Sequence, residues 1–491
     1  MSRVALRALL IAAHVVTLSS AALSNGRFPR AQRLIEVPGD PARLTVAATY
    51  GLLQTADRGH SWSHVCEAAF AEKASYQGDP LIAWLDDQTL LVGIQSGLNV
   101  SRDGGCSFSR ALGAAGEWVP DFTVSRAGPA TVVAIVTKYV DGVTNTLAMS
   151  TDGAKTWTPM GSRLPVVTAL TVDLDPVDPA RVYATGIANG LGVFLRSNDR
   201  GATWTSSPIP GTGTSAAPYI AAVHPTDPKQ IFVRTDAWIT DNDRVANDAL
   251  LHSRDGGTTW SVVFQSQAKM YGFALSPDAS TVLVGLGDPT EGVVPGPLGV
   301  FQSPTDRFAF EQVFDGHIGC LTWTGRGIYV CTSQYYEKFE LAFSAAPLSS
   351  SGSCLEPILR LDQVRGTLAC GATATACDWP TDCQVLGACG DGDATEADAA
   401  RGCGTSDAGG GQVFTDAGRG PDAGGGPPVE EAGTATSEST SSRCSIGVPR
   451  SRAPHFGLQA VAALAIACWS RRRIRIRMPV RGVRRQELGG A

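Results

Sequence analysis

Five aspartates recur between residues 57 and 255 of the chain, and carboxylates at regular spacing are the first candidates for acid–base chemistry. Two carboxylates can serve as proton donor and nucleophile on a glycosidic bond. A single catalytic centre, however, has no use for five identical acids distributed evenly along a sequence. We therefore predict that these aspartates are structural; they are Asp57, Asp103, Asp152, Asp199 and Asp255.

Each aspartate lies in the same phrase of eight residues: Ser or Thr, a spacer, Asp, a spacer, Gly, two spacers and an aromatic residue. Asp and hydroxyl side chains accept hydrogen bonds from nearby backbone N–H groups, and glycine adopts a left-handed conformation without a Cβ clash. The tryptophan side chain is large and apolar and is expected to be buried. The phrase therefore predicts a tight turn between two strands. Ala154 stands at the glycine position of the third copy, and the other predicted turn residues are Gly59, Trp62, Gly105, Phe108, Trp157, Gly201, Trp204, Gly257 and Trp260.

These phrases resemble the Asp-box (BNR) repeats of sialidases, sortilins and related β-propellers. They begin at residues 55, 101, 150, 197 and 253, so successive copies lie 46 to 56 residues apart, and a four-stranded blade needs roughly 40 to 50 residues. Weaker copies at 303–310 and 328–344 support the count, as does a repeated Asp/Pro phrase that we interpret as the turn between the first two strands of a blade. The resemblance implies an all-β fold, a β-propeller of about seven four-stranded blades over residues 31–352. A loose β-solenoid or two small sandwiches is the alternative.

The resemblance to sialidases also implies a catalytic set of three arginines, a Tyr/Glu nucleophile pair and an acidic Asp. The nearest match to the usual Arg-Ile-Pro phrase is Arg27-Phe28-Pro29, beside the predicted leader cleavage site, and the arginines inside the repeats are turn spacers. We therefore predict no catalytic residues. Two-carboxylate glycosidase chemistry of another family stays open, because the separation of two carboxylates is a three-dimensional property.

The middle hairpins of the blades are the elements that would position a binding site. Successive turns of an up-and-down blade alternate between its two faces, so these hairpins open opposite the repeated phrase. Their lengths vary most, at 138–142, 237–248, 287–297 and 333–338, and binding residues tend to lie on variable loops of a rigid scaffold. Aromatic side chains there could stack a sugar or grip a peptide, and two aspartates could take Ca²⁺, although the full EF-hand spacing is missing; a solvated loop is the alternative. The predicted ligand-binding residues are Lys138, Tyr139, Trp238, Asp241, Asp243, Arg244, Tyr335 and Tyr336.

The N-terminus and the cysteines predict export. Residues 1–24 place arginines, a short apolar run and small residues in the order of a secretory signal peptide; a buried helix or an uncleaved anchor is the alternative. The chain has 12 cysteines, all beyond residue 60, and secreted proteins accumulate disulfides. A two-residue turn would set Cys320 and Cys331 opposite each other on paired strands. Cys66 and Cys106, near equivalent ends of successive blades, are the second predicted pair.

The chain changes character after the propeller. Residues 353–390 are predicted to be a Cys-rich closing segment whose cysteines pair, since no histidine is interleaved for zinc. Residues 391–443, rich in Gly, Ala, Asp and Ser, have too few apolar groups to fold and are predicted to be a disordered stalk. In 444–491, Cys444 precedes a short apolar helix and an arginine cluster. This order resembles the C-terminal sorting signals of the MYXO-CTERM type, which implies cleavage near Cys444, lipid attachment and surface display; an uncleaved single-pass anchor is the alternative.

Composition narrows the class of partner. The chain has 491 residues and a net charge of -6, and the repeats carry no basic patch to bind nucleic acid by counterion release. No phosphate-cradling loop or His-rich set indicates a cofactor or a metal. We predict a monomeric, non-enzymatic binding or scaffold protein that recognises a glycan or a protein at the cell surface and is held to the membrane by its C-terminal segment. A secreted sialidase-like or other glycoside hydrolase, an assembly factor for an envelope complex, and a purely structural surface protein are the alternatives.

Overall fold

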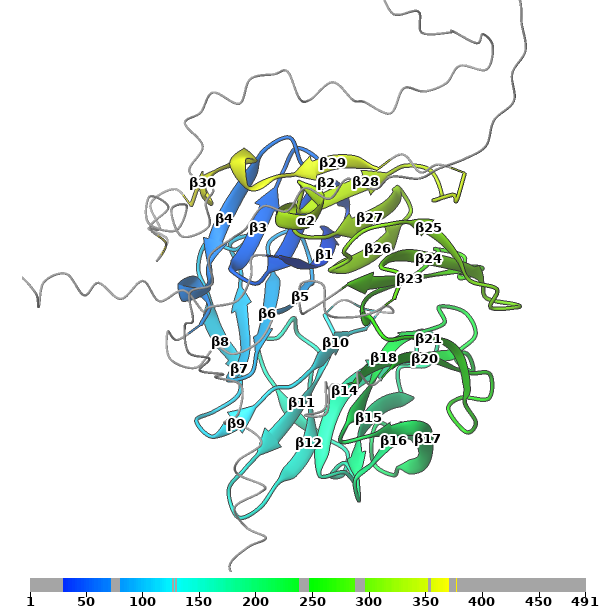
Figure 1. The fold of residues 1–491 in the computed structure, drawn as a ribbon. Helices are drawn as coiled ribbons and strands as arrows, with labels where there is room; N and C mark the ends of the chain where they lie inside the picture. Colours follow the sequence, from blue (N-terminus) through cyan, green and yellow to red (C-terminus); the bar gives the residue numbers. More distant parts are fainter. Residues whose placement is uncertain are drawn as a thin grey trace, which may run out of the picture. The chain divides into compact units, whose positions relative to one another are not determined.

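Seven four-stranded antiparallel units, here called blades, follow one another along the chain in the computed structural model (Figure 1). The structure describes residues 30–71, 80–125, 128, 130–237, 247–287, 296–351, 355–370 and 377. Within each blade the strands pair in sequence order, and blades 4 and 5 are joined into one sheet by the single pair Gly213↔Ala216. The prediction of an all-β propeller with about seven four-stranded blades is confirmed.

The first four blades contain the repeated phrase between their third and fourth strands. A short η1 helix (Glu67–Ala69) follows blade 1, and a two-residue strand, β9 (Glu117–Trp118), pairs with the second strand of blade 3. The strands are β1 (Ala31–Val37), β2 (Asp40–Ala48), β3 (Gly51–Thr55) and β4 (Trp62–Cys66) in blade 1; β5 (Leu81–Trp84), β6 (Leu90–Ile94), β7 (Gly97–Ser101) and β8 (Ser109–Leu112) in blade 2; β10 (Phe122–Val124), β11 (Val132–Lys138), β12 (Thr144–Ser150) and β13 (Thr158–Met160) in blade 3; and β14 (Thr168–Leu174), β15 (Val182–Ala188), β16 (Leu191–Ser197) and β17 (Thr205–Gly213) in blade 4.

The last three blades continue the same order. Blade 5 carries the fifth clear copy of the phrase, and a short helix, α2 (Gln334–Glu337), lies in the middle hairpin of blade 7. The strands are β18 (Ala216–Val223), β19 (Ile231–Ala237), β20 (Asp248–Ser253) and β21 (Ser261–Ser266) in blade 5; β22 (Lys269–Leu275), β23 (Thr281–Gly287), β24 (Gly299–Pro304) and β25 (Glu311–Phe314) in blade 6; and β26 (Cys320–Thr324), β27 (Gly327–Cys331), β28 (Leu341–Ser344) and β29 (Glu356–Leu359) in blade 7.

The second and third strands of the blades read as nearly continuous apolar runs because blades cover them on both faces. β6 and β27, for example, are buried at every residue, as expected for strands that lie inside layers and not at a surface. The outermost strands are more exposed, as in β21. The hydrophobic cores therefore lie between adjacent blades, where the facing sides of two sheets pack together.

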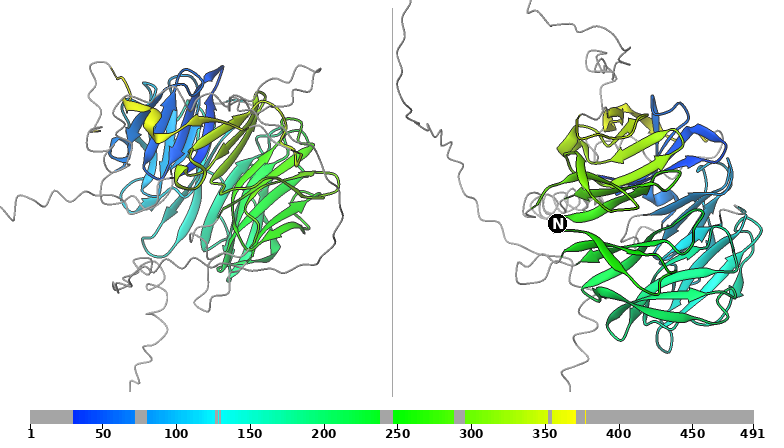
Figure 2. Two further views of the ribbon diagram at one scale, coloured as in Figure 1. Left: turned by 45° about the horizontal axis from the view of Figure 1, so that its top comes forward. Right: turned by 90° about the vertical axis from the view of Figure 1, so that its right-hand side faces the viewer.

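The innermost strands close into a ring. β1 contacts both β5 and β26, β14 contacts both β10 and β18, and β22 contacts β26 and β19. Blades 2 and 3 share a core that includes Leu91 and Phe122. Blades 1 and 7 are therefore neighbours, as the blue and yellow-green strands show (Figure 2). This closed ring excludes the solenoid and the two sandwiches, and it leaves a channel lined by the first strand of each blade.

A C-terminal segment, residues 361–370 and 377, connects blade 7 to blades 1 and 2. We call this segment the strap, and we call the contact between blades 7 and 1, where the ring closes, the seam. After β29 the chain passes through η2 (Leu361–Gln363) into β30 (Val364–Thr367), which pairs in parallel with the outer strand of blade 1, β4. The strap then forms two disulfides, Cys106–Cys370 and Cys66–Cys377, with Cα–Cα distances of 5.4 and 5.5 Å. The fourth strand of blade 7 and this strap both lie beyond residue 352, the predicted end of the propeller.

The disulfides confirm one predicted pair and correct the other. Cys320 and Cys331 are bonded on the paired strands β26 and β27. The predicted Cys66–Cys106 bond is wrong, because the strap lies against the ends of blades 1 and 2 and supplies each of these cysteines with its own partner. Three disulfides indicate a protein that folds in an oxidising compartment outside the cytoplasm.

The predicted leader, stalk and sorting signal, with Cys444, lie outside the described residues, as do the cysteines of the closing segment other than Cys370 and Cys377. Within the described ranges, no helix is both long and apolar enough to cross a membrane.

Candidate functional site

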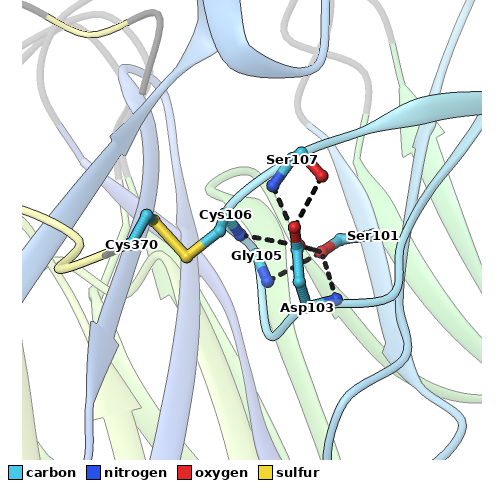
Figure 3. The surroundings of a disulfide bond; sticks show 6 residues. All are labelled: Ser101, Asp103, Gly105, Cys106, Ser107 and Cys370. Carbon is cyan, nitrogen blue, oxygen red and sulfur yellow. Dashed lines mark hydrogen bonds between the residues drawn. A yellow bond between two sulfur atoms is a disulfide. The ribbon is translucent and has the colours of Figure 1, made fainter. Parts of the chain in front are cut away.

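The repeated aspartates are engaged in hydrogen bonds within their own turns. In the second copy the Ser101 hydroxyl donates to Asp103 Oδ1 (2.7 Å) and accepts from the Gly105 N–H (2.8 Å). The Ser107 N–H donates to Asp103 Oδ1 (2.9 Å), and its hydroxyl donates to Oδ2 (2.6 Å) (Figure 3). Both carboxylate oxygens are thus engaged in holding the turn together.

The seventh position of the phrase, which sequence reasoning treated as a spacer, always carries the hydroxyl that binds Asp Oδ2. This donor lies 2.6 Å from its carboxylate oxygen in all five copies. A signal was present in the sequence, since the position is Ser or Thr each time: Ser61, Ser107, Thr156, Thr203 and Thr259.

The fifth position has the left-handed backbone that the glycine pattern predicts. Gly105 has a φ of 106°, and Ala154 keeps the same turn at a φ of 61° despite its Cβ. Two of the arginine spacers reach the next blade: Arg102 donates to the carbonyl oxygens of Gly153 and Ala154 at 3.1 Å, and Arg254 donates to the carbonyl oxygen of Asp306 at 3.2 Å. The phrase therefore also links neighbouring blades.

The face opposite these turns carries the middle hairpins and the connections between blades. The four variable stretches join the second and third strands of blades 3, 5, 6 and 7. Four of the predicted ligand-binding residues, Trp238, Asp241, Asp243 and Arg244, lie outside the described residues. The other four fall on two separate blades, so the described part of the chain does not bring all of them together.

On blade 3, Lys138 and Tyr139 lie beside two residues that sequence reasoning missed. The rings of Tyr139 and Trp118 meet edge to face with centroids 5.0 Å apart, and they are 50% and 44% exposed. Lys138 Nζ lies 2.6 Å from Glu117 Oε1. β9 and β11 hold this set in register, since Glu117 pairs with Lys138 and Trp118 pairs with the residue before it. We call these four residues the blade 3 platform.

The signal for Trp118 was its place in a connection between blades. These connections open on the same face as the middle hairpins, and their residues can therefore contribute to the same surface. The Ala114 N–H and Lys138 both donate to Glu117, which holds the pKa of its carboxyl below the usual value. Glu117 is therefore negatively charged at neutral pH, as its ion pair with Lys138 requires. Blades 3 and 4 also carry four exposed aliphatic residues: Val140, Val143 and Val167 in loops, and Leu191 at the first residue of β16.

On blade 7, Tyr335 and Tyr336 lie on α2. Tyr335 is 55% exposed, whereas the Tyr336 ring stacks on His317 with centroids 4.1 Å apart. Beneath the helix, buried Glu340 accepts hydrogen bonds from the N–H groups of Ala31 and Gln334, each at 3.0 Å. Burial raises the pKa of Glu340 to about 8 despite these bonds. Glu340 thus joins blade 7 to the start of blade 1.

The central channel gathers charged groups from several blades. Arg33 on β1 lies near Asp121, which directly precedes β10, and near Asp173 on β14. Asp121 Oδ2 accepts the Val172 N–H (2.8 Å), and Thr123 donates to Asp173 Oδ1 (3.0 Å). Burial raises the pKa of Asp121 to about 7, against the lowering effect of the Val172 hydrogen bond and Arg33.

The sialidase-like set is not assembled among the described residues. Tyr329 donates a hydrogen bond to Glu36 at 3.2 Å, but its side chain is only 1% exposed and cannot reach a substrate. The described part of the channel brings Arg33 and Arg234 near each other, without a third arginine in the same group. In the described ranges, no three His, Cys, Asp or Glu side chains group closely enough to hold a metal ion.

No protein-family model and no curated protein matches the chain. Several solved structures are similar in fold. An ancestral GH74 enzyme is 14% identical with a TM-score of 0.48, over 68% of this chain and 46% of that one. Niastella koreensis GH74 is 16% identical with a TM-score of 0.39, over 65% and 52%. YCF48 from Cyanidioschyzon merolae is 13% identical with a TM-score of 0.41, over 62% and 93%.

The chain spans about half the length of the two GH74 enzymes. Likenesses this distant carry no argument about its activity, and the propeller architecture rests on the strand pairings and blade contacts of the chain itself.

Proposed function

We propose that this chain is an exported, non-enzymatic β-propeller that binds a glycan on the face of its middle hairpins, through the blade 3 platform. The observation that carries the proposal is the exposed edge-to-face pair Trp118–Tyr139 beside the ion pair Lys138–Glu117. Anchoring at the cell surface through the C-terminal segment is part of the same proposal.

The chemistry of the platform suits a sugar. A pyranose ring has an apolar face of C–H groups, which an exposed aromatic ring can cover, and an edge of hydroxyls that need hydrogen-bond partners. Trp118 and Tyr139 offer the first surface, and both combine a large contact area with low conformational freedom. Lys138 and Glu117 offer a donor and an acceptor at its border, and hydrogen bonds to charged groups are stronger than those between neutral ones.

The test is a glycan array on the full chain, followed by titration calorimetry with the glycan that binds. Trp118→Ala and Tyr139→Ala should each weaken binding about tenfold or more, since each removes a large aromatic contact surface and a tenfold change corresponds to about 1.4 kcal/mol. Val262→Ala is the matched control, because Val262 is an exposed apolar residue on the outer strand of blade 5.

Three outcomes contradict the proposal. Silence on the array would turn attention to a protein partner, for which the exposed aliphatic residues of blades 3 and 4 would be the first surface to test. Binding unaffected by both platform variants would move the site elsewhere. Turnover of a fluorogenic glycoside that disappears in Asp121→Asn would make the chain a hydrolase acting from the channel.

A further inference from the structure

A cavity of about 400 Å³ lies in the central channel. It is separate from the blade 3 platform, because its walls come from the innermost strands of blades 1 to 5, whereas β9 pairs with the second strand of blade 3. Its walls combine charged and apolar side chains, among them Arg33, Ile35, Glu36, Leu81, Phe122 and Asp173.

Arg33 supplies a positive charge to the lining of this cavity. Its side chain is exposed to the channel, and among the described residues none forms a hydrogen bond or an ion pair with its guanidinium. Enclosure by the ring lowers the pKa of Arg33, while Asp121 and Asp173 act in the opposite direction from a distance. A guanidinium carries five N–H donors, so the channel presents a cation with its donors available.

The nearby carboxylates are committed to joining blades 3 and 4. Asp121 accepts the Val172 N–H at 2.8 Å, and Asp173 Oδ1 accepts both the Thr123 hydroxyl at 3.0 Å and the Leu174 N–H at 2.8 Å. These bonds hold the carboxylates on their own strands. They explain why Arg33 is influenced by the two carboxylates without being paired to either.

We propose that the channel is a second binding site, which takes a small monocarboxylate with an apolar body. The ligand carboxylate would pair with Arg33, whose planar guanidinium matches a carboxylate with two parallel hydrogen bonds. Ile35, Leu81 and Phe122 would cover the apolar body. A ligand with one negative charge fits better than a dianion, because Asp173 and Glu36 also line the cavity and would repel a second charge.

Protonation of Asp121 should regulate this site, because Asp121 directly precedes the lining residue Phe122 and is the carboxylate that acts most strongly on Arg33. Its pKa, raised to about 7 by burial, means that it is mostly neutral at pH 6 and mostly charged at pH 8. A charged Asp121 would repel the ligand, so affinity should fall about tenfold from pH 6 to pH 8 if the ligand binds only the protonated form. The other titratable or charged groups that face Arg33 and Asp121 are Glu36, Asp173, Tyr219 and Arg234.

The experiment titrates the full chain with 3-phenylpropanoate by calorimetry at pH 6 and pH 8, and with neutral 3-phenylpropanamide in parallel. We expect the acid to bind at pH 6, the amide to bind at least tenfold more weakly, and Arg33→Gln to lose the preference for the acid. Asp121→Asn keeps an acceptor for the Val172 N–H and should abolish the difference between the two pH values. Arg163→Gln, at an exposed loop arginine, is the matched control.

The proposal is overturned if the acid does not bind at millimolar concentration, if the amide binds equally well, or if Arg33→Gln binds the acid as the natural chain does. Should Arg33→Gln fail to fold, the comparison of acid with amide still decides the matter on the natural chain. Arg33→Lys is then the second variant, because lysine keeps the positive charge but cannot form the bidentate pair with a carboxylate. This variant should bind the acid more weakly than the natural chain does and should still prefer the acid to the amide.

Discussion

The hydroxyl of Thr259 lies 2.6 Å from Oδ2 of Asp255, and the Thr259 N–H lies 2.9 Å from Oδ1 of the same carboxylate. One residue thus binds both oxygens of the aspartate four positions before it. The contact recurs at the same distances in the other four copies, so the turn is fixed by a pair of side chains and not by the aspartate alone.

Thr259→Val should lower the free energy of unfolding by about 1 kcal/mol, because it removes one hydrogen bond to a carboxylate at nearly constant volume. The neighbouring Thr258→Val is the control, since the Thr258 hydroxyl reaches only a backbone carbonyl, at 3.2 Å. Urea denaturation of the three proteins measures the difference. Equal losses in the two variants would show that the seventh position has no special part in the turn.

The aspartates of the phrase should make the protein sensitive to acid. Partial burial acts to raise the pKa of Asp57, but hydrogen bonds from Ser61 and Thr55 lower this pKa to about 2. The pKa of Asp255 is held at about 2 in the same way. The unfolded chain binds these protons at a pKa of about 4. The stabilisation is therefore complete above pH 4 and lost as the pH falls toward 2.

Urea midpoints measured at pH 5, 4, 3 and 2 test this dependence. Asp255→Asn should flatten part of the decline between pH 4 and 2. Asp141→Asn, in the exposed hairpin of blade 3, should leave the curve unchanged. A decline of the same size in both variants would mean that the acid sensitivity arises outside the repeated turns.

Glu340 should make the fold less stable as the pH rises. Burial raises its pKa to about 8 in the folded protein, while the unfolded chain releases this proton at a pKa of about 4.3. Its protonated form is therefore the stabilising one, fully effective below about pH 4 and lost progressively up to about pH 8. Glu340→Gln should remove that slope, although its amide can accept only one of the two N–H groups.

Unfolding free energies at pH 5 and pH 8.5 provide the measurement for Glu340. Glu356→Gln, at an exposed position on β29 of the same blade, should keep the slope of the natural chain. If Glu340→Gln keeps the slope too, protonation of Glu340 does not change the stability of the contact between blades 7 and 1 in this pH range.

Loss of the strap disulfides should destabilise the ring more than loss of the hairpin disulfide. Cys66–Cys377 and Cys106–Cys370 close segments of 311 and 264 residues, whereas Cys320–Cys331 closes 11. The stabilisation from a disulfide grows with the length of the closed loop and is typically about 2 to 4 kcal/mol. Thermal unfolding of Cys377→Ser should begin at a lower temperature than that of Cys331→Ser; the reverse order would contradict this account.

Much of the fold could be predicted from the sequence because its signals are local. The side chains of Asp57 and its four equivalents accept their hydrogen bonds from residues within four positions, so each turn leaves a local signal in the sequence, and its repetition makes that signal strong. The blade count followed from the spacing of such turns. The partner of Cys66 could not be predicted in the same way, because it lies on a strap that returns from the other end of the sequence.

The candidate sites depend on contacts between distant residues and were therefore largely hidden. Tyr139 was found through its hairpin, but Trp118 was missed because only strand register brings β9 against β11. Arg33 and Asp121 lie on blades 1 and 3, and nothing in their local sequence distinguishes them from other charged residues near strands. Their proximity follows from ring closure, which the repeat implies but does not specify residue by residue.

The order of attachments along the strap determines how the propeller bears mechanical load. A pull applied from residue 378 onward reaches Cys377 first and passes through a covalent bond to Cys66 in blade 1; Cys370 then carries the remaining tension to Cys106 in blade 2. The hydrogen bonds of β30 and the strands of blade 7 lie behind these two bonds. Tension on the chain would therefore be shared by two blades before it could separate blade 7 from blade 1, and reduction of both disulfides would remove that protection.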